Sequence, residues 1–216
     1  MIRPDYLNPL MREGLDGSLV FWLRGQGSRA GSSGKVFDLS YKGNHGTITG
    51  AVWKNSPLNH PVLNFDGVDD YVRVTRTTSI ELANAMTLMA WVNPDTTYGS
   101  GHTRICDKSA GAPNEGFYFL IVLDTRFLRF ALDLSVSGSV YYDTTKIIPT
   151  NQWTFCVGTY DGSAVRIYVN GVLEKEQTGL SGTIQQNTTK DLFIGADSAT
   201  SGSNIKGKID NMMIFN

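Results

Sequence analysis

Residues Trp153–Gln177, WTFCVGTYDGSAVRIYVNGVLEKEQ, constrain the fold more than any other stretch of the chain. Three apolar runs are separated there by Asp161-Gly162 and Asn170-Gly171. Asp-Gly and Asn-Gly readily adopt the positive φ angles that two-residue hairpin turns require. Two such turns about ten residues apart predict a three-stranded antiparallel meander.

The second and third runs of this meander differ in pattern. Val165–Val169 alternates, with apolar residues at its odd-numbered positions, so one of its faces is predicted to pack against the core. The third run becomes charged at Glu174, Lys175 and Glu176. Such a charged end is typical of an edge strand that faces solvent.

The rest of the chain has the same β character. Its 23 glycines and recurring turn dipeptides are typical of many short strands, and only SIELANA at residues 79–85 favours a helical turn. One strand is predicted over Thr47–Trp53, and residues 61–74 are predicted as two short strands joined at Asp66-Gly67 by a hairpin or a bulged bend. MTLMAWVNP at residues 86–94 is predicted as a central strand that ends at Pro94. We expect an all-β chain with about fourteen strands, in one domain over residues 18–216 with an N-terminal arm over residues 1–17.

Charge and apolar runs exclude several classes of protein. The net charge of −1 gives no basic field for nucleic acid. No run reaches the roughly 18 apolar residues of a membrane span, and the start MIRPDYLNPLMREGLDG shows no signal peptide. Cys106 and Cys156 lie in apolar runs and are predicted as buried free thiols, with a bridge between neighbouring strands as the alternative.

Four motifs occur along the chain in a recognisable order: DLSYKGNHGTITGA, FDGVDDYV, WTFCVGTYDGSAVRIYVNGVL and KGKIDNMMIFN. Together they resemble the LamG-like jelly-roll domains of the concanavalin A-like lectin/glucanase superfamily, over Leu15 to Asn216. The resemblance implies two curved antiparallel sheets that pack face to face, each with six or seven strands, and chain ends that lie side by side. That agrees with the strands expected from the residues alone.

An enzymatic role is not supported by the acidic residues. Glucanases of this superfamily carry E-x-D-x-E on one strand, so that nucleophile and acid/base share a cleft. The only close glutamates here are Glu174 and Glu176, whose spacing predicts one shared face, but the middle aspartate is missing and the position is expected to be solvated. Neither a GxSxG turn nor a histidine pair typical of a metalloenzyme is present. We therefore expect no catalysis.

Calcium is the cofactor that the resemblance implies, near the motifs at the two ends of the domain. Its oxygen ligands are expected from Asp38, Asn44, Asp66 and Asp210, because calcium binds six to eight oxygens and turns such as GNHG add carbonyls. Asp69 and Asp70 are near-equal candidates to Asp66. The alternative is that Asp38 and Asp66 cap turns and that Asp210 pairs with a lysine or an arginine.

A glycan ligand is implied in the same way, on a sheet face and its rim loops. The predicted contacts are Tyr98, His102, Arg104 and Tyr142, with Tyr118 and Tyr141 also considered. Tyr141 and Tyr142 are adjacent, so the two must face opposite sides of a strand and one is expected to be exposed. The four tryptophans are predicted to lie in the core: Trp22, Trp53, Trp91 and Trp153.

These expectations describe a non-catalytic binding or surface module. The apolar side chains of the arm predict packing on another chain, in a homo-oligomer or a capsid-like assembly. A free-standing jelly roll without a signal peptide favours display on a virion, with an extracellular location as the alternative. The competing functions are a lectin-like carbohydrate-binding module of a polysaccharide-degrading system and, less favoured, a glycosidase or lyase.

Overall fold

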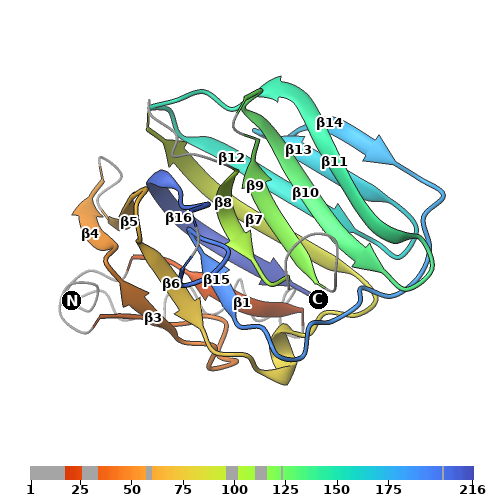
Figure 1. The fold of residues 1–216 in the computed structure, drawn as a ribbon, viewed down its shortest axis with the longest axis horizontal. Coiled ribbons are helices and arrows are strands. Elements are labelled where there is room, and N and C mark those ends of the chain that lie inside the picture. Colours follow the sequence, from red (N-terminus) through yellow and green to blue (C-terminus); the bar gives the residue numbers. More distant parts are fainter. Residues whose placement is uncertain are drawn as a thin grey trace, which may run out of the picture.

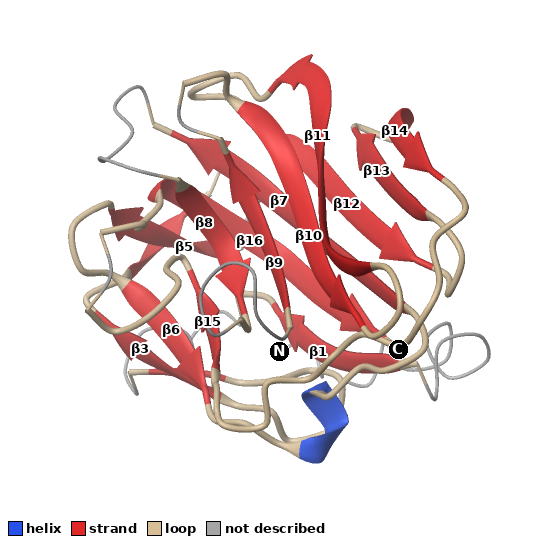
Figure 2. Cartoon of the chain, turned by 45° about the vertical axis from the view of Figure 1, so that its right-hand side comes forward, coloured by secondary structure: helices blue, strands red, loops and turns tan. Residues whose placement is uncertain are grey.

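A computed structural model describes residues 18–25, 34–56, 60–95, 102–109, 116–122, 124–200 and 202–216. In this part of the chain, sixteen strands form two antiparallel sheets that stack face to face (Figures 1 and 2). The predicted all-β, two-sheet jelly-roll sandwich is thereby confirmed. The arm at residues 1–17 lies outside the described residues, so its role in assembly stays a prediction.

Sheet A holds the first and last strands and the predicted meander. Its order is β14-β13-β12-β7-β16-β5-β4, and β1 also pairs with β16. Its strands are β1 (Leu19–Leu23), β4 (Val52–Asn55), β5 (Pro61–Asp66), β7 (Met86–Pro94), β12 (Thr154–Tyr160), β13 (Val165–Val169), β14 (Val172–Gln177) and β16 (Lys206–Phe215).

Sheet B covers the other side of the core. Its order is β11-β10-β9-β8-β15-β6-β3-β2. Its strands are β2 (Lys35–Val36), β3 (Gly46–Thr49), β6 (Tyr71–Val74), β8 (Thr103–Asp107), β9 (Phe117–Ile121), β10 (Phe127–Leu134), β11 (Gly138–Ile147) and β15 (Leu192–Ile194). Helix in the described residues is limited to the single turn η3 (Thr78–Ile80), within the stretch where the sequence favours one.

The meander β12-β13-β14 is present as predicted, with β14 at the edge of sheet A. Asn170 and Gly171 form the expected two-residue turn, with φ angles of 53° and 81°. The turn at Asp161 is longer than predicted, because four residues separate β12 from β13. One oxygen of the Asp161 side chain accepts hydrogen bonds from the backbone amides of Ser163 and Ala164, which holds this wider loop closed.

Two predicted connections are wrong in the same way. Thr47–Trp53 is not one strand: it breaks at Gly50, so that β3 joins sheet B and β4 joins sheet A. The stretch around Asp66-Gly67 is neither a hairpin nor a bulged bend, because β5 lies in sheet A and β6 in sheet B. Both turns therefore carry the chain across the sandwich instead of along one sheet.

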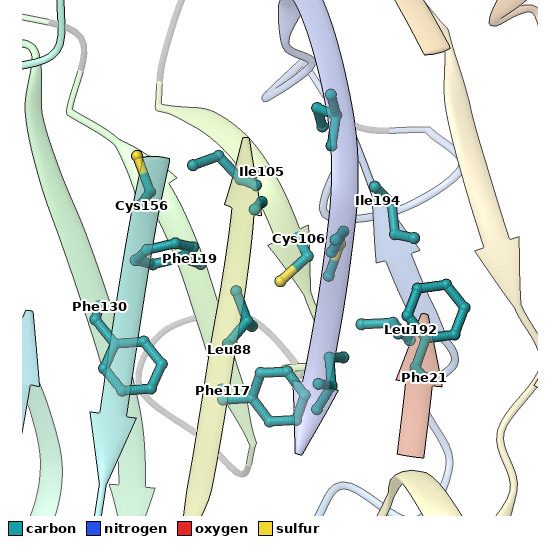
Figure 3. Packing of buried hydrophobic residues seen from close by; sticks show 14 of the residues in the cluster. Phe21, Leu88, Ile105, Cys106, Phe117, Phe119, Phe130, Cys156, Leu192 and Ile194 are labelled. Atoms are coloured by element: carbon teal, nitrogen blue, oxygen red, sulfur yellow. The ribbon is translucent and has the colours of Figure 1, made fainter. Parts of the chain in front are cut away.

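The core fills the space between the two sheets with apolar side chains. Leu88 from β7 and Phe119 and Phe130 from β9 and β10 meet there (Figure 3). Cys106 and Cys156 are both buried and unbridged, and Figure 3 shows their sulfur atoms well apart. Burial raises the pKa of both thiols, so they act as small apolar core groups.

The prediction that all four tryptophans belong to the core is wrong for Trp91. Trp22 is buried and Trp53 and Trp153 are half-buried, but Trp91 is 39% exposed. Its position on β7 alternates with buried Ala90 and Val92, so the indole lies on the outer face of sheet A. A nearly continuous apolar strand therefore places one large aromatic ring outside.

Candidate functional site

The outer face of sheet B displays arginines and tyrosines from four neighbouring strands, β8 to β11. Phe119 and Phe130 point into the core. Because side chains alternate along a strand, their neighbours Tyr118 and Arg129 point to the outer face. We call the outward side chains of this face the Arg–Tyr surface, which comprises Arg104, Tyr118, Arg129, Tyr141 and Asp143.

Each arginine of the Arg–Tyr surface stacks on a tyrosine ring. The guanidinium carbon of Arg104 lies 4.4 Å from the ring centroid of Tyr118, and that of Arg129 lies 4.5 Å from the centroid of Tyr141. Such cation–π contacts fix long side chains that would otherwise be mobile. Leu120 is the register partner of both Arg104 and Arg129, and its buried side chain separates the two stacked pairs.

One of the two arginines is held in position by a carboxylate. Arg129 Nε and Nη2 donate to the two oxygens of Asp143 at 2.6 and 2.7 Å. This bidentate geometry raises the pKa of Arg129 above its ordinary value, since the hydrogen bonds favour the charged form. The surface thus presents a preorganised guanidinium beside Tyr141, whose ring is 60% exposed.

The other arginine, Arg104, has N–H donors without a hydrogen-bond partner among the described residues. Arg104 is only 8% exposed, and its Nε lies 3.1 Å from Asp107 Oδ2 and 3.9 Å from Asp197 Oδ2. The first contact is an ion pair without hydrogen-bond geometry, so Nε and Nη1 of Arg104 and Oδ2 of Asp107 are buried without a hydrogen-bond partner among the described residues. Buried donors in this state favour a polar ligand that supplies acceptors.

Burial also perturbs the titrating groups around Arg104. It raises the pKa of Asp107 to about 6, although Arg104 and two hydrogen bonds from Ser109 oppose the change. His102 is exposed at the rim, and its pKa is lowered first by partial burial and then by the positive charges of Arg129 and Arg104. A neutral imidazole at this position can both donate and accept a hydrogen bond.

The predicted glycan contacts are only partly brought together. His102 and Arg104 lie close together and Tyr118 stacks with Arg104, whereas Tyr98 lies outside the described residues. Tyr142 requires a correction: its ring is half-buried against the core beneath Lys175, and its neighbour Tyr141 is the exposed one. Alternation shows that the two face opposite sides, but not which of them faces solvent.

Sequence reasoning missed Arg129 and Asp143. Arg129 could have been found from FLRFALDL, because a charged residue between two apolar neighbours, here Leu128 and Phe130, faces outward on a strand. The pairing of Arg129 with Asp143 could not, because it depends on the register between β10 and β11, which places the two residues opposite each other.

The four predicted calcium ligands do not form one site. Asp38 Oδ1 accepts from the backbone amides of Trp22 and Ser40, and Oδ2 accepts from Ser40 Oγ and the amide of Asn44. Asn44 in turn donates to the carbonyl of Val20 at 2.6 Å. The polar groups of Asp38 and Asn44 thus have protein partners, as expected of residues that cap a turn.

Asp210 is also engaged elsewhere. Its Oδ2 lies 2.7 Å from His60 Nε2 and accepts from Asn211 Nδ2 at 3.0 Å, while Oδ1 is buried without a hydrogen bond among the described residues. The prediction that Asp210 would pair with a lysine or arginine, as the alternative to calcium, is replaced by this pair with a histidine.

Acidic oxygens converge instead at the crossing between the sheets. Within the described ranges, one group of three has ligand atoms that all lie within 4.8 Å of one another: Asp66, Asp69 and Asp70. Burial and the like charges of its two neighbours raise the pKa of Asp70, although a hydrogen bond from the Asp66 amide opposes the change. Clustered carboxylate oxygens fit the ligand preference of calcium, so these three residues would hold the ion if it binds.

The two glutamates of β14 do not have the regular one-face spacing that the sequence predicts. A register shift between Ile167 and Tyr168 interrupts the alternation that predicted one shared face. Glu174 lies 3.6 Å from Lys146 of β11, whereas Glu176 accepts from Arg166 at 2.7 Å within sheet A. The two carboxylates are therefore engaged by different strands.

Comparison with known proteins places this fold. A sequence model of the concanavalin A-like lectin/glucanases superfamily matches residues 66–216. No curated protein matches the chain.

Solved structures with the same fold include domain 4 of AbnA, a GH43 extracellular arabinanase from Geobacillus stearothermophilus, in complex with arabinotriose. It has a TM-score of 0.66 and 19% identity, and 93% of each chain is covered. The binding domain of Paraclostridial mosquitocidal protein 1 has a TM-score of 0.70 and 17% identity, over 92% of this chain and 48% of that one. The binding domain of botulinum neurotoxin DC in complex with SialylT has a TM-score of 0.66 and 17% identity, over 93% and 48%. The chain thus spans about half the length of the toxin binding domains that it matches.

Proposed function

The chain belongs to the concanavalin A-like lectin/glucanase superfamily, and we propose that it is a non-catalytic glycan-binding module whose ligand contacts the Arg–Tyr surface. The observation that carries the proposal is the pair of arginines stacked on tyrosine rings across four neighbouring strands.

This surface offers the two kinds of contact that a saccharide needs. The exposed ring of Tyr141 can pack against the apolar C–H face of a sugar ring, while the guanidinium groups of Arg104 and Arg129 donate to hydroxyl or carboxylate oxygens. Neither arginine has to be reorganised on binding, because each already rests on its tyrosine.

A binding role is favoured over hydrolysis by the state of the carboxylates on this face. Glycosidases use two carboxyl groups that flank the scissile bond, one to protonate and one to attack or activate water. Asp143 is committed to a bidentate pair with Arg129, and Asp107 lies buried beneath Arg104. Two carboxylates held by arginines favour structural roles over acid–base roles.

Two solved structures with the same fold favour different settings for the module. Domain 4 of the arabinanase AbnA resembles this chain over 93% of both lengths and was solved with arabinotriose, which favours a module that accompanies a polysaccharide-degrading enzyme. The neurotoxin binding domain solved with SialylT favours recognition of a cell-surface glycan instead. Display on a virion, through the arm at residues 1–17, stays a separate prediction.

The proposal is tested by binding of arabinotriose and sialyllactose, measured by calorimetry on the full chain. Tyr141→Ala and Arg129→Gln are each expected to lower the affinity for the saccharide about tenfold or more, since one central contact contributes more than about 1.4 kcal/mol of binding free energy. Tyr41→Ala is the matched control, because Tyr41 is an exposed tyrosine (79%) on a loop away from this face.

Unchanged affinity in both variants, with melting temperatures like that of the unaltered chain, would overturn the assignment of this surface. Release of reducing sugar from a polysaccharide substrate would overturn the non-catalytic role. If neither probe binds and a broader glycan array also gives no binding, the chain does not bind a glycan and the proposal is wrong.

A further inference from the structure

A polar cavity lies on the opposite side of the sandwich from the Arg–Tyr surface, on the outer face of sheet A. It has a volume of about 300 Å³, and its walls come from β5, β7, β16 and the turn at Asn151. We call it the amide pocket, because three asparagine side chains line it: Asn64, Asn93 and Asn151. Its charged lining residues are Asp66, Asp95, Lys206 and Lys208.

The strand register explains why amides and an ammonium meet in this pocket. Lys208 on β16 is the register partner of Asn64 on β5 and also of Asn93 on β7. Side chains at paired positions share a sheet face, so these three form one row across adjacent strands. Buried Leu63, Val92 and Ile209 flank the row and point to the core.

The donors in this row have no partner of their own. Among the described residues, the side chains of Asn64, Asn93 and Lys208 form neither a hydrogen bond nor an ion pair, and all three are half-buried. The neighbouring lysine is different, because Lys206 Nζ lies 3.9 Å from Asp95 Oδ2. Lys208 is thus a half-buried ammonium between two free amides, in a pocket that also holds the Lys206–Asp95 pair and the carboxylate of Asp66.

An aromatic platform adjoins the amide pocket on the same face. Trp91 precedes Asn93 by two residues on β7, so both side chains point outward. Trp91 is 39% exposed, and its ring lies against that of Phe155, with ring centroids 5.2 Å apart. This packing holds the ring in place while leaving part of its surface open to solvent.

We propose that the amide pocket and Trp91 form a second saccharide site, specific for a pyranose that carries a carboxylate. The carboxylate is bound by Lys208 between the amides of Asn64 and Asn93, and the sugar ring packs on Trp91. Asp66 on the pocket wall accepts hydrogen bonds from sugar hydroxyls.

The second site does not depend on the Arg–Tyr surface, because the two lie on outer faces of different sheets. If both bind, the module holds two glycan segments on opposite sides of the sandwich and can crosslink them. Two sources carry the required chemistry: a uronate of a plant or microbial polysaccharide and a sialate of a cell-surface glycan.

The test is a calorimetric titration of the full chain with trigalacturonate and with sialyllactose, each beside its neutral counterpart, a galactose trisaccharide and lactose. Lys208→Gln is expected to lower the affinity for the acidic ligand at least tenfold, because a charge-assisted hydrogen bond is lost. Asn93→Ala and Trp91→Ala are expected to weaken it as well. Lys35→Gln serves as the control, since Lys35 is an exposed lysine at the far edge of sheet B.

Tyr141→Ala separates this inference from the proposed function. If sialyllactose binds at both places, Tyr141→Ala removes one binding component and Lys208→Gln removes the other. An acidic-ligand component that is lost in Lys208→Gln and retained in Tyr141→Ala supports the second site even if the Arg–Tyr surface binds nothing. Unchanged affinity in folded Lys208→Gln and Asn93→Ala overturns it, and so does equal affinity for the acidic and neutral trisaccharides. The preferred acid identifies the source as uronate or sialate.

Discussion

Asp107 holds its carboxylate in a buried position that disfavours the charge. Its carboxylate is 1% exposed, accepts two hydrogen bonds from Ser109 through Oδ1, and faces Arg104 with Oδ2. Burial nevertheless prevails and raises its pKa to about 6. The native state therefore binds a proton more readily than the unfolded chain, whose carboxyl has its ordinary pKa of 3.8. It follows that this residue makes the protein more stable as the pH falls from about 6 to about 4.

We predict that Asp107→Asn removes this pH dependence. A difference between pKa values of 3.8 and about 6 corresponds to a change in unfolding free energy on the order of 3 kcal/mol over that range. Urea unfolding at pH 4.5 and at pH 7.5 measures it in both proteins. Asp133→Asn is a control carboxylate on the same face. Equal pH dependence in Asp107→Asn and the unaltered chain would contradict the prediction.

Strand β12 meets strand β10 across the core through a glycine. A Cβ atom added at Gly158 would lie only 2.7 to 3.0 Å from three ring carbons of Phe130. Phe130 is 1% exposed and stacks edge-on against Phe119, so it has no space to retreat. The missing side chain on one sheet therefore accommodates a ring from the other.

Gly158→Ala is accordingly expected to lower the unfolding free energy by about 1 to 3 kcal/mol, despite the better strand propensity of alanine. Phe130→Leu removes the ring, so the double variant should lose less than the sum of the two single variants. Chemical denaturation of all four proteins gives the coupling. Strict additivity of the two changes would show that the contact is not the cause.

Elements were predicted well wherever local chemistry decides them. The Asn170-Gly171 turn and the alternation of Val165–Val169 suffice to predict the meander. The crossings at Gly50 and Gly67 could not be predicted, because a positive φ angle marks a turn without saying which sheet the next strand joins. That choice depends on long-range pairing, of β3 with β6 and of β5 with β16.

The same limit applies to the candidate site. Alternation alone indicates that Arg129 faces outward, and it also indicates that Tyr141 and Tyr142 face opposite ways. It cannot tell which of the two tyrosines faces the core: the prediction names Tyr142, whereas Tyr141 is the exposed one. The resemblance to the family places Trp91 in a motif strand and so predicts a core position, but only the packing of the two sheets decides which face of that strand is covered.

At the scale of the whole molecule, the loop at residues 66–70 is where the chain passes from sheet A to sheet B. It holds the three clustered aspartates Asp66, Asp69 and Asp70. Mutual repulsion contributes to the raised pKa of Asp70, and a bound cation would relieve it. A calcium ion at this position would connect the two sheets, which differs from the expected link between the ends of the domain.

Calcium is predicted to raise the melting temperature by several degrees. Binding only to the folded state at a hundredfold excess over Kd adds about 2.7 kcal/mol, and the shift follows from the unfolding entropy of a domain this size. Scanning calorimetry with calcium and with chelator measures it. Asp69→Asn should abolish the calcium-dependent rise in melting temperature. Asp38→Asn should lower the stability of the protein but leave that rise in place. The same melting curve in calcium and in chelator would leave these aspartates as turn residues.

The two ends of the sandwich lie side by side, since the amide of Asn216 donates to the carbonyl of Ser18 at 2.7 Å. Leu19 pairs with Phe215 and Leu23 with Met212, so β1 and β16 run antiparallel from that point. A mechanical load applied between residues 18 and 216 pulls at right angles to these two strands. Their hydrogen bonds then break one after another, as in a zipper, and not all together as in shear. A module tethered through both ends would yield at low force by releasing β1, while β16 stays paired with β5 and β7.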